Sequence, residues 1–138
     1  MVVPLVVGGI LLVVLVLLFR PVARTGAVAF AQANLRRAAE AAEDLATDGS
    51  LADADREMLA ARGVVDDLLL IDPDQSSNDP EVVSVLATDS AWTGSARAET
   101  GECFWIRVAA TGGTVFGTGT DCSAEEAGLA PPGTWPEP

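Results

Sequence analysis

The stretch Asp72–Glu81 contains the residue types that could bind a metal ion. Oxygen-bearing side chains recur there at alternate positions, as they do in calcium-binding loops. They belong to Asp72, Asp74, Ser76, Asn78, Asp79 and Glu81. The stretch departs from the helix–loop–helix calcium template, because Ser77 stands where glycine is needed and Val83 where the closing glutamate belongs. We therefore expect a solvated acidic turn, and calcium bound by four of these residues is the second interpretation. Those four are Asp72, Asp74, Asn78 and Asp79.

Two cysteines, Cys103 and Cys122, enclose 18 residues and could form a disulfide. In an oxidising compartment this bond would stabilise the fold by roughly 3 kcal/mol, because it restricts the unfolded chain. Two free, buried thiols are the alternative. A zinc site needs more ligands than two thiols, and the chain has no histidine to complete one.

Catalytic residues are hard to place in this chain. It has no histidine, so histidine-based triads are excluded and no side chain titrates near neutral pH without a large pKa perturbation. The serines that could act as nucleophiles have no base beside them in the sequence. They are Ser84, Ser90, Ser95 and Ser123. The neighbouring Asp66 and Asp67 would point to opposite faces of a strand, which argues against a shared acid–base site. We therefore expect a protein that is not an enzyme and needs no cofactor.

Charge is distributed unevenly along the chain. Residues 1–39 hold four arginines and no acidic residue, whereas residues 40–138 hold the other four arginines and all 20 acidic residues, a net charge of −16. A body this acidic repels phosphate backbones and anionic lipid headgroups. Nucleic-acid binding is therefore not expected, and the body should stand away from a membrane surface.

The apolar run Val2–Phe19 has 18 residues and no charge. As a helix it would span about 27 Å, close to the hydrocarbon thickness of a bilayer. A cleaved signal peptide is one alternative, because Ala-x-Ala sites occur within residues 27–33, and a buried core helix is the other. The run is long for a signal peptide and has no polar face, so we expect a membrane span. Gly8 and Gly9 could permit close helix approach there.

The orientation of this span rests on conflicting signals. Arg20 and Arg24 follow the apolar run, and the positive-inside rule would place the body in the cytoplasm. The cysteine pair and the acidity of the body favour the other side. We expect a single-pass protein of the cell membrane with an extracytoplasmic C-terminal domain.

The elements that would position these residues begin with a helical stem over residues 22–48. Small apolar residues recur there at spacings of three and four. They are Leu35, Ala38, Ala42 and Leu45, with Phe30 and Ala31 extending the stripe. Ser50 is a suitable N-cap for a second, short helix that ends at Gly63. Its buried side would be Leu51, Met58 and Leu59.

The rest of the body is expected to be β-rich. Residues 82–87 are rich in β-branched side chains, and residues 103–109 alternate between two faces. Phe104, Ile106 and Val108 would face one way, and Trp105 and Arg107 the other. Gly112-Gly113 predicts a hairpin turn and a returning strand over residues 114–118. The expected fold class is α+β, a long N-terminal helix packed on a small antiparallel sheet.

These elements define four expected regions. They are a transmembrane anchor (1–21), a helical stem (22–48), a small head (49–123) and a disordered, proline-rich tail (124–138). Of the tryptophans, Trp92 is expected in the core and Trp135 in the tail. Trp105 fits either a sheet face or an interface.

Three stretches follow one another in a definite order. They are the apolar N-terminus, the stem NLRRAAEAAEDLATDGSLADA, and ETGECFWIRVAATGGTVFGTG with Cys122 after it. In this order they resemble the type IV pilin family, especially the pilin-like proteins of Gram-positive actinobacteria. The resemblance does not extend to the prepilin leader. Gly9 could be the glycine before the cleavage site, but Ile10 follows it and Val14 stands where pilins have glutamate.

The resemblance implies a structural or interaction subunit of a cell-surface filament or secretion apparatus. Its partners would be the lipid bilayer and copies of itself or related pilin-like subunits. The resemblance also implies that Cys122 closes a C-terminal disulfide loop. The alternative function is a signal-anchored extracytoplasmic binding or accessory module, for calcium or a protein partner, that does not assemble into filaments.

Overall fold

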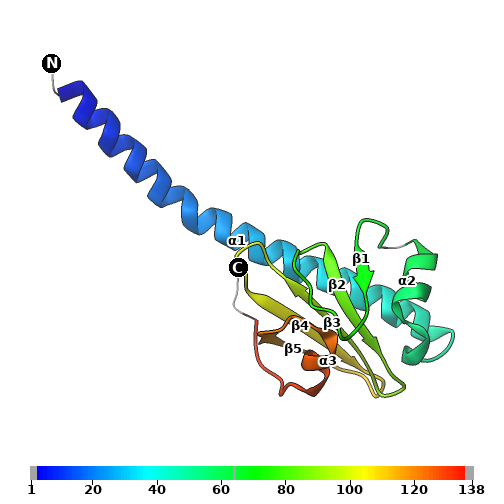
Figure 1. Cartoon of the computed structure of the whole chain (residues 1–138). Helices are drawn as coiled ribbons and strands as arrows, with labels where there is room; N and C mark the ends of the chain where they lie inside the picture. Colours follow the sequence, from blue (N-terminus) through cyan, green and yellow to red (C-terminus); the bar gives the residue numbers. More distant parts are fainter. Residues whose placement is uncertain (1–2, 64, 136–138) are drawn as a thin grey trace.

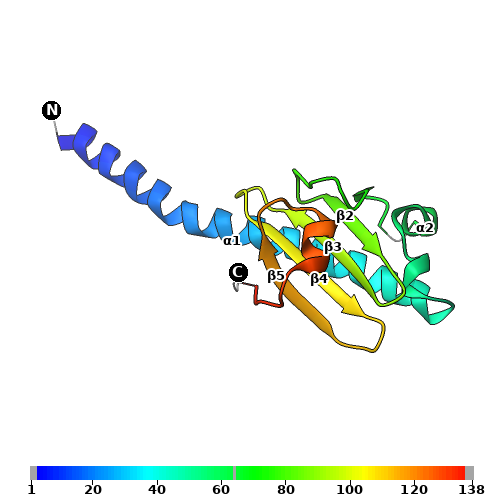
Figure 2. The ribbon, with the colours of Figure 1, turned by 60° about the horizontal axis from the view of Figure 1, so that its bottom comes forward.

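A long helix leads into an α+β body in the computed structural model (Figure 1). The backbone is described for residues 3–63 and 65–135, and side chains for residue 13 and for residues 25–63 and 65–135. In chain order the elements are α1 (Val3–Thr47), η1 (Leu51–Asp53), α2 (Arg56–Arg62), β1 (Leu69–Ile71), β2 (Val82–Ala87), β3 (Ala91–Arg97), β4 (Cys103–Ala109), β5 (Thr114–Gly119) and α3 (Ala124–Leu129). The sheet lies between α1 on one side and α3 on the other (Figure 2).

The sheet has five strands in the order β1-β2-β3-β4-β5. Strands β2 to β5 pair antiparallel, but β1 and β2 are parallel, with Leu69 opposite Val82. The predicted small antiparallel sheet is therefore wrong in part, because the sheet is mixed. The loop over residues 72–81 crosses back before β2 begins, and a parallel pair needs such a crossover connection.

Helix α1 packs on the sheet through one apolar stripe. Its buried residues run from Val28 to Leu45, and Leu35, Ala38 and Ala42 have no exposed surface. The predicted stripe is confirmed, although Phe30 at its start is 45 % exposed. Across the interface lie alternate residues of the sheet, since successive strand side chains point to opposite faces. They are Val83, Val85, Trp92, Ala96, Phe104, Ile106 and Val108.

The segment after α1 forms two short helices where one was predicted. Ser50 caps η1 in a capping box, in which its hydroxyl accepts from the Ala52 N–H and Asp53 accepts from the Ser50 N–H. Asp55 then caps α2, which ends at Gly63 with φ 69°, a left-handed conformation that suits glycine. The predicted burial of Met58 is wrong, because only one side of so short a helix faces the rest of the body.

The rear face of the sheet, opposite α1, is covered by the end of the chain. α3 lies there with Ala124 and Ala127 buried, and Ser123 caps it by accepting from the Glu126 N–H. The predicted disorder of residues 124–138 is therefore wrong for residues 124–135, while residues 136–138 are outside the described part. A disulfide and packing contacts, which composition does not reveal, hold this segment in place.

No helix among the described residues is long and apolar enough to cross a bilayer. Of the run Val2–Phe19, only Val13 has a described side chain. The membrane anchor, with Gly8 and Gly9, thus lies outside the described side chains and stays a prediction.

Candidate interaction site

The two cysteines form the predicted disulfide on the rear face. Cys103 begins β4 and Cys122 precedes α3, with 5.3 Å between their Cα atoms. Both are buried, and the Ser95 hydroxyl lies 3.4 Å from the sulfur of Cys103. Cys122 has φ 57°, and its carbonyl accepts from the Ser77 N–H at 2.9 Å. The disulfide thus joins the start of α3 to β4, and Ser77 joins it to the loop over residues 72–81.

Two arginines of the rear face, Arg97 and Arg107, bind backbone carbonyls of segments that are distant in sequence. Arg107 donates to the carbonyls of Ala127, Gly128 and Ala130, at the C-terminal end of α3. Its guanidinium also lies 5.0 Å from the ring centre of Trp105, within cation–π distance. Arg97 donates to the carbonyls of Ser77, Gly101 and Thr120. Both side chains therefore have structural partners.

The last described residues wrap around the edge of the sheet, and we call residues 122–135 the C-terminal strap. Gly133 donates its N–H to the carbonyl of Phe116 on β5, at 2.8 Å. Trp135 then lies on the α1 side, where its indole N–H is 3.1 Å from the Trp105 carbonyl. Its ring contacts Phe116 at a centroid distance of 4.6 Å, and the Arg36 guanidinium lies 5.1 Å from it.

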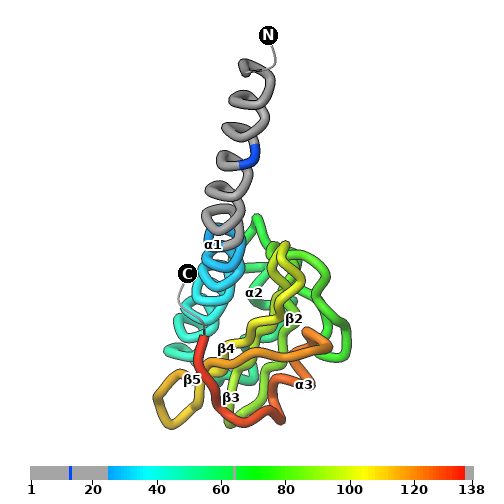
Figure 3. The backbone as a smooth tube through the Cα atoms, turned by 90° about the vertical axis from the view of Figure 1, so that its left-hand side faces the viewer, coloured from blue at the N-terminus to red at the C-terminus, as the bar shows by residue number. Residues whose placement is uncertain are grey.

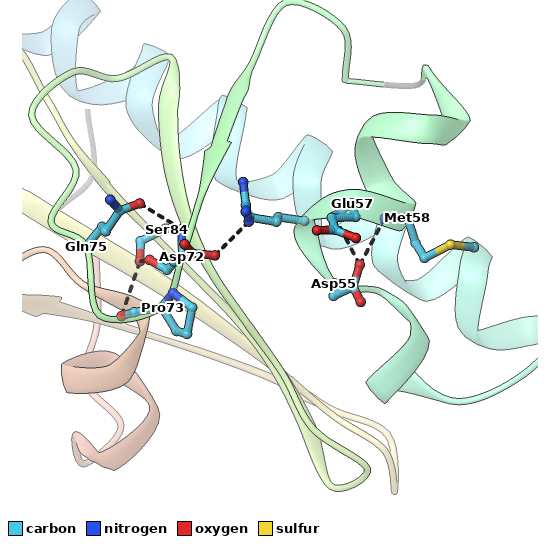
Figure 4. A network of polar contacts seen from close by, with 8 residues as sticks. Asp55, Glu57, Met58, Asp72, Pro73, Gln75 and Ser84 are labelled. Carbon is cyan, nitrogen blue, oxygen red and sulfur yellow. Dashed lines mark hydrogen bonds and ion pairs between the residues drawn. The ribbon is translucent and has the colours of Figure 1, made fainter.

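The predicted calcium residues are not brought together. Asp72 pairs with Arg56 of α2 at 2.6 Å, and its N–H donates to the side chain of Gln75 (Figure 4). Asp79 accepts from the Glu81 N–H at 2.9 Å, as a turn residue does. Asp74 and Asn78 are exposed. Within the described part of the chain, no group of three or more His, Cys, Asp or Glu side chains could hold a metal ion.

Two carboxylates have lowered pKa values. Arg37 donates two hydrogen bonds to Asp67, at 2.7 and 2.8 Å, and they hold the pKa of Asp67 below its usual range. For Glu126, partial burial acts to raise the pKa. Hydrogen bonds from the Asp121 N–H and the Thr120 N–H and hydroxyl outweigh this effect, so the pKa is lowered. Both carboxylates are therefore held in their charged form by local hydrogen bonds.

The serines considered as nucleophiles have structural partners. The Ser84 hydroxyl donates to the Asp72 carbonyl and accepts from the Ala124 N–H, which ties β2 to α3. Ser95 contacts the disulfide, and Ser123 caps α3. Ser90 lies beside the hydroxyl of Thr88 in the β2–β3 turn. No described partner of these hydroxyls is a base.

A cleft of about 470 Å³ lies at the end of the body where α1 finishes. We call it the distal cleft. It is open to solvent and is lined by the last turns of α1, the segment 49–51, the β2–β3 turn and the β4–β5 hairpin. Figure 3 shows the end of α1 and this hairpin at the same end of the body. Glu43 and Asp89 are the acidic groups of the lining, and Val108 is a buried apolar one. Volumes of 300 to 1,000 Å³ are typical of ligand sites.

Comparisons of this chain with protein-family models, with curated proteins and with solved structures found no match.

Proposed function

We propose that this chain is a membrane-anchored, pilin-like structural or interaction subunit of a cell-surface filament or secretion apparatus. The proposal combines the apolar run Val2–Phe19 as an anchor with a disulfide-bonded head outside the membrane. The chain would associate laterally with copies of itself or with related subunits. No catalytic step enters the proposal, which needs only surfaces that bind other proteins.

The observation that carries the proposal is the division of α1 into two faces. One face is buried on the sheet from Val28 to Leu45. The other is exposed along the same length and includes Ala33, Arg36 and Glu40. Since the helix continues back to Val3, a neighbour that contacts its exposed face in the head could follow it along its length. Helices that pack side by side in this way bury surface along whole turns.

Site-directed cross-linking of the full-length chain tests lateral association. Single cysteines at exposed α1 positions, Ala33→Cys and Glu40→Cys, are compared with Glu125→Cys on α3 as the matched control. Membranes that carry each variant are oxidised and resolved without reductant. We expect cross-linked dimers from the α1 positions and not from the control. Recovery of the intact chain in the soluble fraction would contradict the anchor.

The second candidate is an extracytoplasmic binding module that does not assemble. The distal cleft favours it, because a single copy of the head already forms that cleft. Under this interpretation the α1 cysteines give monomers in the membrane fraction, and a soluble partner binds to the head.

A further inference from the structure

We propose that the distal cleft binds a lysine or arginine side chain carried by an extended segment of a partner protein. This inference adds the chemistry of the partner to the proposed interaction role. It rests on that role only because the partner must be able to reach the head.

The electrostatics of the cleft favour a cation. Glu43 and Asp89 contribute carboxylates, and the Ser50 hydroxyl donates to Asp89 at 3.2 Å. No basic residue is present among the described residues that line the cleft. The last turn of α1, whose residues are all described by the structure, also has no basic residue. The negative end of the helix dipole therefore adds to the two carboxylates.

The lining of the cleft suits a long side chain with a charged end, because it has both apolar and acidic residues. Val108 in the lining is buried. The other apolar residues of the lining are Ala46, Leu51, Ala109 and Ala110. The methylene groups of lysine or arginine can lie on such a surface while the charged group reaches a polar rim. The hydroxyls of Thr47 and Thr114 are further acceptors in the lining. A metal ion would not use these apolar residues.

The described arginines of the chain itself already have partners, so we assign the cleft to a basic side chain of another protein. Arg36 lies over Trp135, and three others pair with acidic residues. Those pairs are Arg37–Asp67, Arg56–Asp72 and Arg62–Asp48. Arg97 and Arg107 donate to backbone carbonyls. The body, with a net charge of −16, therefore keeps many exposed carboxylates, and a partner of opposite charge complements it.

The test uses the full-length chain in a neutral detergent and the peptide Gly-Ser-Lys-Val-Lys-Ser-Gly-amide, which carries a rhodamine label on its amino terminus. Binding is followed by fluorescence anisotropy. We expect saturable binding at low salt and none to the peptide with glutamate in place of lysine. The variant Glu43→Gln with Asp89→Asn should weaken binding about fivefold or more. The control, Glu99→Gln with Glu125→Gln, makes the same charge change at exposed positions elsewhere and should alter binding less than about twofold.

A third variant, Ala110→Trp, places a bulky side chain at the lining of the cleft without changing its charge and should also weaken binding. The proposal is overturned if the lysine peptide does not bind, if both charge variants weaken binding equally, or if Ala110→Trp has no effect. Lateral association is measured separately through the α1 cysteines. A failure here would thus leave the proposed assembly role standing.

Discussion

At the scale of single residues, glycine sets how closely the large aromatic side chains approach the sheet. Gly94 faces the ring of Trp92, and Gly117 faces the indole of Trp105 on the neighbouring strand. A Cβ atom at either position would overlap the adjacent ring. Both tryptophans are almost fully buried, so neither ring has room to move aside.

We expect Gly117→Ala to destabilise the protein by about 1–3 kcal/mol, because its methyl group overpacks Trp105. Urea unfolding of the full-length chain in neutral detergent, followed by tryptophan fluorescence, measures the change. Gly26→Ala is the control, since nothing lies within 4 Å of a Cβ there and alanine favours a helix. Equal stability of Gly117→Ala and the wild type would show that the indole can shift.

The lowered pKa of Glu126 has a consequence for stability against pH. In the unfolded chain a glutamate has a pKa of about 4.3. Because the folded pKa is lower, the unfolded state binds more protons between the two values, and stability falls as the pH drops through that range. The contribution is fully present above the unfolded pKa and is lost below the folded one.

We therefore expect Glu126→Gln to be less stable than the wild type at pH 6, with the difference narrowing as the pH falls below about 4. Thermal unfolding by circular dichroism between pH 3 and pH 6 measures it. The neighbouring Glu125→Gln, at an exposed position, serves as the control. A difference that stays constant with pH would show that the carboxylate charge is not what stabilises the turn over residues 120–121.

At the scale of elements, the C-terminal strap joins parts of the body that are distant in sequence. The disulfide fixes its start to β4, Arg107 holds the end of α3, and Trp135 reaches the α1 side. The strap closes over the rear face and around β5, so its attachment stabilises the whole sheet.

Loss of the disulfide is expected to cost about 3 kcal/mol of stability, given its sequence separation of 19 residues. The variant Cys103→Ala with Cys122→Ala should unfold at lower urea concentration than the wild type. Added reductant should destabilise the wild type and leave the variant unchanged. If reductant has no effect on the wild type even after full unfolding and refolding, the bond does not contribute.

Sequence patterns predicted the elements whose information is local. Strand β2 and strand β4 have the predicted bounds, and α1 buries the predicted stripe. Strand β3 was missed because its residues AWTGSAR are mostly small. Gly94 leaves room for the ring of Trp92, and Ser95 lies against the disulfide. The parallel pairing of β1 was missed because no local pattern specifies the direction of a partner strand.

The site was harder to predict than the fold. The disulfide followed from the spacing of two cysteines, but the distal cleft is built from three regions that are far apart in sequence. They are residues 43–51, the β2–β3 turn and the β4–β5 hairpin. α3 did have a signal, because Ser123 and Glu126 have the spacing of a capping box. The prolines after α3, Pro131 and Pro132, led to the prediction of a disordered tail instead.

At the scale of the whole molecule, net charge determines how strongly two copies of the body repel each other. Each body has a net charge of −16, and like charges oppose close approach. Surface charges more than about 8–10 Å apart are screened at physiological ionic strength. Lateral association and binding of a basic partner should thus respond to salt in opposite directions.

We expect the yield of cross-linked dimers from Ala33→Cys to rise between about 20 and 300 mM sodium chloride, since screening weakens head-to-head repulsion. Binding of the lysine peptide should fall over the same range. The two titrations are carried out in the same detergent. Cross-linking that decreases with salt would show that opposite charges, not apolar contacts, hold the helices together.

The position of Gly133 against β5 has one more consequence. An unpaired strand at the edge of a sheet is a template for strands of other molecules. Here the strap occupies part of the β5 border, and the opposite border, β1, is only three residues long. The fold thereby limits amyloid-like fusion while its helix surface stays open to neighbours.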